Sequence, residues 1–266
     1  MSKIDHAIHE FQTIEQMAKR DGRVNRIHPL VKLCLTVLYI AAVVSFPKYD
    51  LAGAAVMAVY PIVLFNISGV SFADAVKRLR IVLPLVLIVG ILNPFFDRRI
   101  VLEIGALKVS GGVLSMLTLM IKAVLTVFSS YLLIATTPIE EICCAMNCIR
   151  IPQVFVIEVL LIYRYITVLL SEARRVTDAY LLRAPGQKGI AFRAWGPLAG
   201  QMLMRSMDRA EQIYESMRVR GFNGQFRLRR KGRNSPFDII YFLVWVLVFI
   251  ALRFLPVLEM VGRAAA

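Results

Sequence analysis

The sequence has few of the residues that build metal centres or disulfide frameworks. It contains 3 histidines and 4 cysteines in 266 residues, and no two cysteines form a CxxC pair. Zinc sites and disulfide frameworks need such paired or regular spacings, so we expect no metal and no disulfide. We interpret the cysteines as small apolar packing residues: Cys34, Cys143, Cys144 and Cys148.

The remaining candidate for a metal face is near the N-terminus. His6 and His9 are three residues apart and stand beside Asp5 and Glu10. A solvated N-terminal helix explains this cluster more simply than a bound ion. The first 29 residues also lack an apolar core of the kind a signal peptide has, so we expect no cleavable signal there.

The sequence also lacks the motifs of nucleotide binding and hydrolysis. The stretch "GQKGIAF" has neither the spacing of a GxxxxGK[ST] phosphate loop nor a strand before it. HExxH and GxSxG are both missing. We therefore expect no catalytic residue, no cofactor and no nucleotide turnover by this chain alone.

What is present is apolar residues in long runs. The chain is 58% hydrophobic, against roughly 45–50% in soluble domains. Runs of the length that crosses hydrocarbon alternate with basic segments, which predicts an all-α, multi-pass protein of the cell membrane. We predict five transmembrane helices, at Leu30–Phe46, Leu51–Ile67, Ile81–Phe96, Val113–Ala135 and Phe237–Val257.

Two lysines fall within these runs. Lys32, at the start of the first, is able to snorkel back to the side on which the run begins. Lys122, near the middle of the fourth, is expected to face the bundle interior or a partner, because a charge at the bilayer centre costs about 2.5–3.5 kcal/mol. Carboxylates are nearly lacking in the runs, which does not support an ion-coupled carrier. Residues 97–112 alternate like a β-hairpin and are placed outside.

The basic residues concentrate in one region. Of the 32 Lys and Arg residues, 16 lie within 136–236, beside membrane segments, so anionic lipid explains the net charge of +14 better than nucleic acid does. Residues 154–170 are apolar, but Glu158 and Arg164 would be buried at a cost in a fifth crossing. We therefore predict about three cytoplasmic helices here, one long and starting near 154, another from about Pro197 to Arg220.

The predicted order of parts is a cytoplasmic N-terminal segment (1–29), four transmembrane helices (30–135), a cytoplasmic helical domain (136–236), and a last transmembrane helix with its tail (237–266). The N-terminus is expected inside and the C-terminus outside.

Two cytoplasmic helices end in arginine followed by residues that stop a helix, "AYLLRAPG" and "SMRVRGFNG". An arginine in a last turn favours the helix dipole, and glycine is the usual residue after it. Arginine also forms planar bidentate pairs with carboxylates across interfaces. Both uses remain open from the residues alone.

At these segments the sequence resembles the transmembrane T component of energy-coupling-factor (ECF) importers, most closely the cobalt/nickel subgroup. The resemblance covers nearly the whole chain. It includes "HPLVKLCLTVLYI", "SFADAVKRLRIVLPLVLIVGILNPFF", "TTPIEEICCAMNCIRIPQVFVIEVLLIYRYI" and "DRAEQIYESMRVRGFNG". The family carries two X-Arg-X signatures at the ends of its coupling helices. Val219-Arg220-Gly221 matches the second signature well, whereas Leu182-Arg183-Ala184 matches the first only at its arginine.

The resemblance implies a scaffold rather than an enzyme. Two cytoplasmic ABC ATPase subunits would bind Arg183 and Arg220, and a separate membrane subunit would capture the substrate. The alternatives are a T component for a vitamin such as biotin or a shared module, a membrane enzyme acting on phosphate-bearing lipid, and a solitary basic scaffold. Glu140-Glu141 is the only acid pair such an enzyme has, and it suits the first turn of a helix after Pro138.

Overall fold

The computed structural model describes residues 3–20, 22, 24–96, 100–104, 107–184, 186–187, 189–224 and 236–254. The chain divides into two compact units. One, here named the apolar unit, comprises residues 16–138 and 231–266. The other, named the basic unit, comprises residues 1–15 and 139–230. The division between 15 and 16 falls inside the first helix, α1 (Lys3–Ala18).

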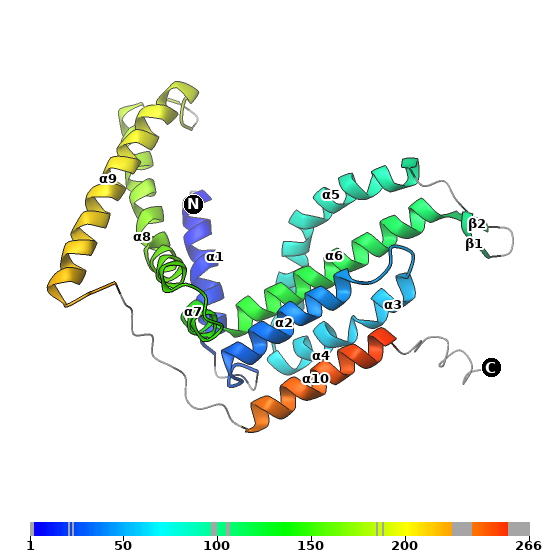
Figure 1. Cartoon of the computed structure of the whole chain (residues 1–266). Helices are drawn as coiled ribbons and strands as arrows, with labels where there is room; N and C mark the ends of the chain where they lie inside the picture. The colour runs from blue at the N-terminus through cyan, green and yellow to red at the C-terminus, as the bar shows by residue number, and fades with distance from the viewer. Residues whose placement is uncertain are drawn as a thin grey trace. The chain divides into compact units, whose positions relative to one another are not determined.

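The apolar unit is a helical bundle built around α6 (Gly111–Thr136), which packs against α2 (Pro29–Val44) and α5 (Phe72–Phe96) (Figure 1). Its other helices are α3 (Leu51–Val56), α4 (Val59–Ser68) and α10 (Pro236–Phe254). A two-stranded antiparallel hairpin, β1 (Ile100–Ile104) with β2 (Leu107–Ser110), precedes α6. The hairpin predicted for residues 97–112 is thereby confirmed where the structure describes it.

Local sequence signals account for several helix boundaries. Pro29 occupies the first position of α2, where its missing N–H costs nothing, and the His28 ring accepts a hydrogen bond from the Leu30 N–H. The Asp50 carboxylate accepts the Gly53 N–H at 2.8 Å and caps α3. Gly69 ends α4 at a φ of 65°, a left-handed conformation that glycine adopts without strain.

The second apolar run is broken, where the sequence predicts one continuous helix. Between α3 and α4 the chain turns at Met57 and Ala58. Pro61 has no N–H to donate to the carbonyl of Met57, four residues before it. That carbonyl instead accepts the Tyr60 N–H at 3.3 Å and the Tyr39 hydroxyl at 2.9 Å. The backbone of α4 and a side chain of α2 therefore share the acceptor that the proline does not use.

The core of the apolar unit is an aromatic cluster. Tyr39, Tyr60, Trp245 and Phe249 are all buried, and their ring centroids are 4.6 to 5.9 Å apart in the contacting pairs. These spacings are the ones that aromatic pairs favour, worth about 0.5–1.5 kcal/mol each beyond burial. They join α2 and α4 to the last helix, α10.

Cations bind the C-terminal ends of helices in this unit. Buried Lys32 donates to the carbonyl of Thr136, the last residue of α6, at 2.9 Å. Lys122 donates to the carbonyls of Val44 and Phe46, and Arg253 donates to that of Ser45. Both therefore bind the end of α2, where the helix dipole is negative.

These contacts bear on two predictions. The Lys32 side chain is buried and its ammonium group binds the C-terminal end of α6, an acceptor that was not predicted; that it points back to the side where the run begins stays a prediction. Lys122 faces the bundle, as predicted, and has two backbone acceptors there.

Four described segments are long and apolar enough to cross a membrane by length and composition: Leu51–Ser68, Gly111–Thr136, Gln153–Arg183 and Pro236–Phe254. α2 is apolar but shorter. α5 is not among the four, although its residues 81–94 carry no charge and expose Ile81, Leu85 and Ile88. The predicted class, an all-α membrane protein, is confirmed. The count of five spans is not reproduced by length and composition, and the end of the predicted fifth span, Val257, lies outside the described residues.

The basic unit contains α7 (Ile139–Cys148), α8 (Gln153–Arg183), α9 (Phe192–Val219) and residues 3–15 of α1. The long helix predicted from 154 is confirmed as the 31-residue α8. α9 begins five residues before Pro197, which lies inside the helix and has no N–H to donate to the carbonyl of Arg193. By length and composition α8 qualifies as a membrane span, so its predicted cytoplasmic location remains a prediction.

Contacts with α8 hold the basic unit together. Glu172 of α8 pairs with Arg205 of α9, and Arg174 of α8 pairs with Asp5 of α1. The Phe11 ring lies 4.9 Å from that of Tyr163. Glu140 and Glu141 occupy the first turn of α7, as predicted.

Candidate functional site

The end of α8 presents the first of the two predicted signatures. Arg183 is the last helical residue, and Ala184 is the C-cap, its N–H bonded to the carbonyls of Tyr180 and Leu181. Leu182 is 84% exposed, and Arg183 is exposed beside it. A leucine this exposed next to an arginine gives the helix end an apolar and a cationic group with nothing covering them in the described part of the chain.

The end of α9 presents the second signature within a defined helix-capping motif. Arg220 is the C-cap, and Gly221 follows at a φ of 82°. The Phe222 N–H bonds to the Met217 carbonyl at 3.0 Å, and the Gly221 N–H to the Arg218 carbonyl at 2.9 Å. This pair of bonds is the Schellman motif, which needs a left-handed residue at the position of Gly221. The glycine therefore fixes the backbone on which Arg220 is carried.

The two ends share a pattern that sequence spacing alone did not reveal. Val219, which precedes Arg220, is 89% exposed, as Leu182 is before Arg183. Neither arginine side chain has a hydrogen-bond or ion-pair partner among the residues that the structure describes. Each end is thus an exposed apolar side chain followed by an arginine that is free to bind elsewhere.

The two ends are far apart along the helix pair. Glu172 contacts Arg205, whereas Leu161, earlier in α8, shares a pocket with Met217, later in α9, so the helices run antiparallel. Arg183 lies at the end of the pair where α9 begins, and Arg220 lies at the other. With 28 residues in α9 and a rise of 1.5 Å per residue, about 40 Å separates the ends.

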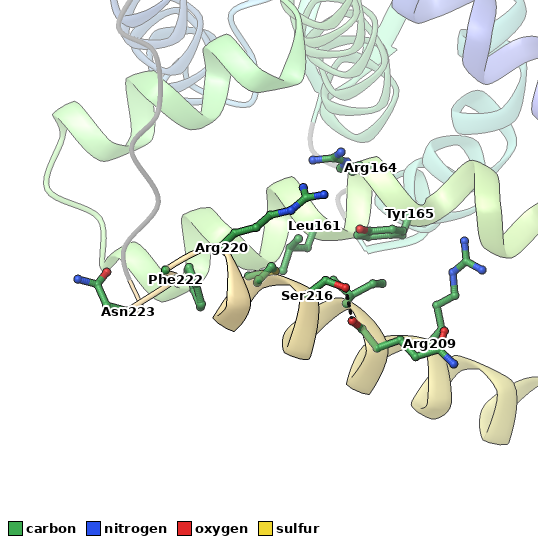
Figure 2. A pocket seen from close by; sticks show the side chains of 12 residues that line it. Leu161, Arg164, Tyr165, Arg209, Ser216, Arg220, Phe222 and Asn223 are labelled. Carbon is green, nitrogen blue, oxygen red and sulfur yellow. Dashed lines mark hydrogen bonds between the residues drawn. The ribbon is translucent and has the colours of Figure 1, made fainter.

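Arg220 also lines a pocket between α8 and α9 with a volume of about 790 Å³. Figure 2 shows Arg164 on α8 and Arg209 on α9 around the same space. The twelve lining residues include these three arginines and no Asp or Glu. Such a pocket suits an anionic group.

The sequence did not lead us to Arg209, and it indicated Arg164 only as a charge that would be costly to bury in a membrane crossing. Arg209, Ile213, Ser216 and Arg220 follow one another at spacings of three and four, which places them on one face of α9. That spacing is visible in the sequence. The matching position of Arg164 depends on how α8 and α9 pack and is not visible there.

The remaining polar candidates do not form a metal site. Among the residues that the structure describes, no group of three or more His, Cys, Asp and Glu side chains is arranged to hold an ion. Cys143 and Cys144 are buried, whereas Cys148 is exposed. Burial raises the pKa of the Cys143 thiol, and the nearby Glu140 and Cys144 raise it further. A buried thiol with a raised pKa is a packing residue, as predicted for it.

Similar proteins point to one functional class. The family model CbiQ, described as cobalt transport protein, matches residues 23–231. A fused cobalt transport protein CbiMQ of Methanocorpusculum labreanum is 32% identical over 128 residues, which are 47% of this chain and 21% of that longer protein. An energy-coupling factor transporter transmembrane protein EcfT of Thermosediminibacter oceani is 25% identical over 87% of this chain and 92% of its own length.

A third relative, a nickel permease LarQ of Lactiplantibacillus plantarum, is 25% identical over 38% of this chain and 36% of its own length. These relatives are named as transport components, not enzymes. The family model spans the apolar bundle up to α6 and the two arginine-ended helices, and on that match the chain belongs to the CbiQ family of cobalt transport proteins.

Proposed function

We propose that this chain is the transmembrane scaffold of an ECF-type importer. It couples ATP hydrolysis by two cytoplasmic ABC ATPase subunits to the reorientation of a separate substrate-binding membrane subunit. Membership of the CbiQ family and the similarity to proteins named EcfT support the scaffold role. The chain is a multi-pass protein of the cell membrane in this proposal, with the basic unit on the cytoplasmic side.

The observation that carries the proposal is the pair of exposed arginine ends. Arg183 and Arg220 have no described partner, and each follows an exposed apolar side chain. The site residues are Leu182, Arg183, Ala184, Val219, Arg220 and Gly221. Because about 40 Å separates the two ends, each fits a different acceptor groove, as two ATPase subunits would supply.

Cobalt or nickel is the proposed cargo. The family description and one relative name cobalt, and another relative names nickel. In this importer the metal is captured by the substrate-binding subunit. A vitamin-specific or shared module is the alternative, supported by relatives named only for energy coupling.

A lipid-modifying enzyme is a weaker second candidate. The pocket lined by Arg164, Arg209 and Arg220 suits a phosphate, but among the described residues no carboxylate lines it to act as an acid or base. The acids Glu140 and Glu141 belong to the first turn of α7, and neither lines that pocket.

The test is purification of tagged full-length chain co-expressed with its ATPase and substrate-binding subunits. We expect the ATPases to co-purify in detergent and Arg220→Ala to reduce their retention strongly, because stranding a buried carboxylate at an interface costs about 2–5 kcal/mol. Arg183→Ala should have a milder effect, and the double variant a larger one. Expression and membrane insertion should be unchanged.

Arg218→Ala is the matched control, since Arg218 lies two residues from Arg220 on the same exposed helix end. If Arg218→Ala and Arg220→Ala reduce ATPase retention equally, or if neither does so, Arg220 is only a helix cap. Impermeant thiol labelling of Ser171→Cys from outside intact cells tests the sidedness: efficient labelling contradicts a cytoplasmic basic unit.

A further inference from the structure

The pocket between α8 and α9 has a one-sided charge. Arg164 comes from α8, and Arg209 and Arg220 come from α9, so cationic residues of both helices line the pocket (Figure 2). None of the three has a hydrogen-bond or ion-pair partner in the described part of the chain. A pocket lined by charges of one sign attracts groups of the opposite sign.

The neighbouring part of the same helix pair is different. A smaller cavity of about 280 Å³ is lined by Glu172 and Asp208 as well as by Arg205 and Arg209, and Arg205 is paired with Glu172. The charges of that cavity are supplied from within the chain. The described lining of the larger pocket contains no carboxylate, although α9 carries the acids Asp208, Glu211 and Glu215 at positions that do not line it.

The rest of the lining shows what kind of anion fits. Tyr165, Gln212, Ser216 and Asn223 supply hydrogen-bonding groups, and four side chains are apolar: Leu161, Ile213, Met217 and Phe222. A mixed lining of this sort, in a space of about 790 Å³, suits a short peptide segment that combines carboxylates with apolar side chains.

We propose that the pocket receives an acidic segment of the ATPase subunit that engages the α9 end, and that Arg164 and Arg209 act with Arg220 to bind its carboxylates. The inference rests on the proposed function and adds two binding residues outside both signatures. We choose the ATPase subunit as the partner because the pocket is continuous with the α9 end. Arg220, Gly221 and Phe222 belong both to that end and to the pocket lining.

An anionic lipid headgroup offers phosphate chemistry to the same arginines, and the experiment includes it as an opposing outcome. The chain is reconstituted in nanodiscs of phosphatidylcholine alone, or with phosphatidylglycerol added, and the affinity of the purified ATPase subunits is measured over a series of salt concentrations. The variants are Arg164→Glu, Arg209→Glu and the double change, in the full chain.

We expect the double reversal to weaken ATPase binding by at least about tenfold in neutral nanodiscs and to flatten its salt dependence. Arg164→Gln with Arg209→Gln should give a smaller loss in the same direction, with thermal unfolding unchanged, which separates lost charge from misfolding. Arg175→Glu is the control, because Arg175 is 78% exposed in the middle of α8 and lies neither in the pocket lining nor at a helix end; it should change affinity by less than about twofold.

Unchanged affinity in both nanodisc types overturns the proposal. So does a loss confined to nanodiscs that contain phosphatidylglycerol, which assigns the pocket to lipid. If Arg183→Ala and Arg220→Ala weaken binding while the pocket reversals do not, the pocket inference fails and the coupling function stands. If ATPase does not bind the unaltered chain, the coupling function itself fails.

Discussion

The two units of this molecule use cations in opposite ways. In the apolar unit, Lys32, Lys122 and Arg253 each donate to backbone carbonyls at or beyond the C-terminal end of a helix. In the basic unit, Arg183 and Arg220 also stand at helix ends, yet their side chains have no described partner. A lysine or arginine near a helix end therefore does not reveal its role by itself. Its role depends on whether the charged group binds a backbone carbonyl or remains exposed.

The comparison separates cations that stabilise the fold from cations that are available to bind another chain. A cation bound to a buried carbonyl stabilises the fold, because removing it leaves that carbonyl unsatisfied. An exposed arginine contributes at most about 1 kcal/mol to its own helix through the dipole, and its charge remains available to another chain.

The largest expected effect on stability is that of Lys32→Met. The substitution keeps a long apolar stem but leaves the Thr136 carbonyl without its described cationic donor, at a cost of about 1–3 kcal/mol. Thermal unfolding of the purified protein in detergent measures the change. Lys77→Met is the control, since Lys77 forms an exposed i,i+3 pair with Asp74 worth under about 1 kcal/mol.

Arg220→Ala belongs in the same unfolding series, because it should leave the midpoint nearly unchanged while it weakens ATPase binding. If Lys32→Met is no more destabilising than Arg220→Ala, the division between structural and assembly cations does not hold.

A smaller effect is expected for Gly221→Ala. At a φ of 82° an L residue is strained by about 1–2 kcal/mol, so the Schellman cap should open and Arg220 should lose its fixed position. Retention of ATPase during purification should fall although the arginine is still present. Gly200→Ala is the matched control on α9, since a Cβ there meets no atom within 4 Å and alanine favours a helix. Equal retention by the two variants would show that the cap geometry is irrelevant to assembly.

The smallest effect concerns thiol reactivity in α7. Cys148 is exposed, whereas Cys143 is buried and has a raised pKa, so less of it is thiolate at neutral pH. Alkylation followed by mass spectrometry should modify Cys148 first, and the Cys143 rate should remain lower as the pH rises from 7 to 9. Faster modification of Cys143 would contradict the packing of α7 described above.

The sequence was sufficient for the helices that coincide with uninterrupted apolar runs. α6 differs from its predicted range by two residues at one end and one at the other, and the long α8 was predicted as a single helix. The break between α3 and α4 was not predicted. Pro61 was visible, but the compensation of its effect by Tyr39 depends on tertiary packing.

Packing also explains what was missed at the site. The arginines at helix ends were identified because a local signal marks each of them, either a following glycine or other residues that stop a helix. Arg164 and Arg209 are mid-helix residues on separate helices, 45 positions apart in sequence, and only the antiparallel packing of α8 on α9 brings them to one pocket. The acceptor of Lys32 was not predicted for the same reason, because it lies 104 residues further along the chain.

That separation has a consequence in time. A chain made at about 5–20 residues per second completes α2 roughly 5–20 s before Thr136 is added. During that interval the Lys32 ammonium has no α6 carbonyl to bind, and the only good solvent for it is the water and headgroups at the membrane surface. We therefore expect the Lys32 ammonium to stay among water and headgroups until the end of α6 is available to bind it. The first helix is then expected to reach its final position only when the fourth apolar run is complete.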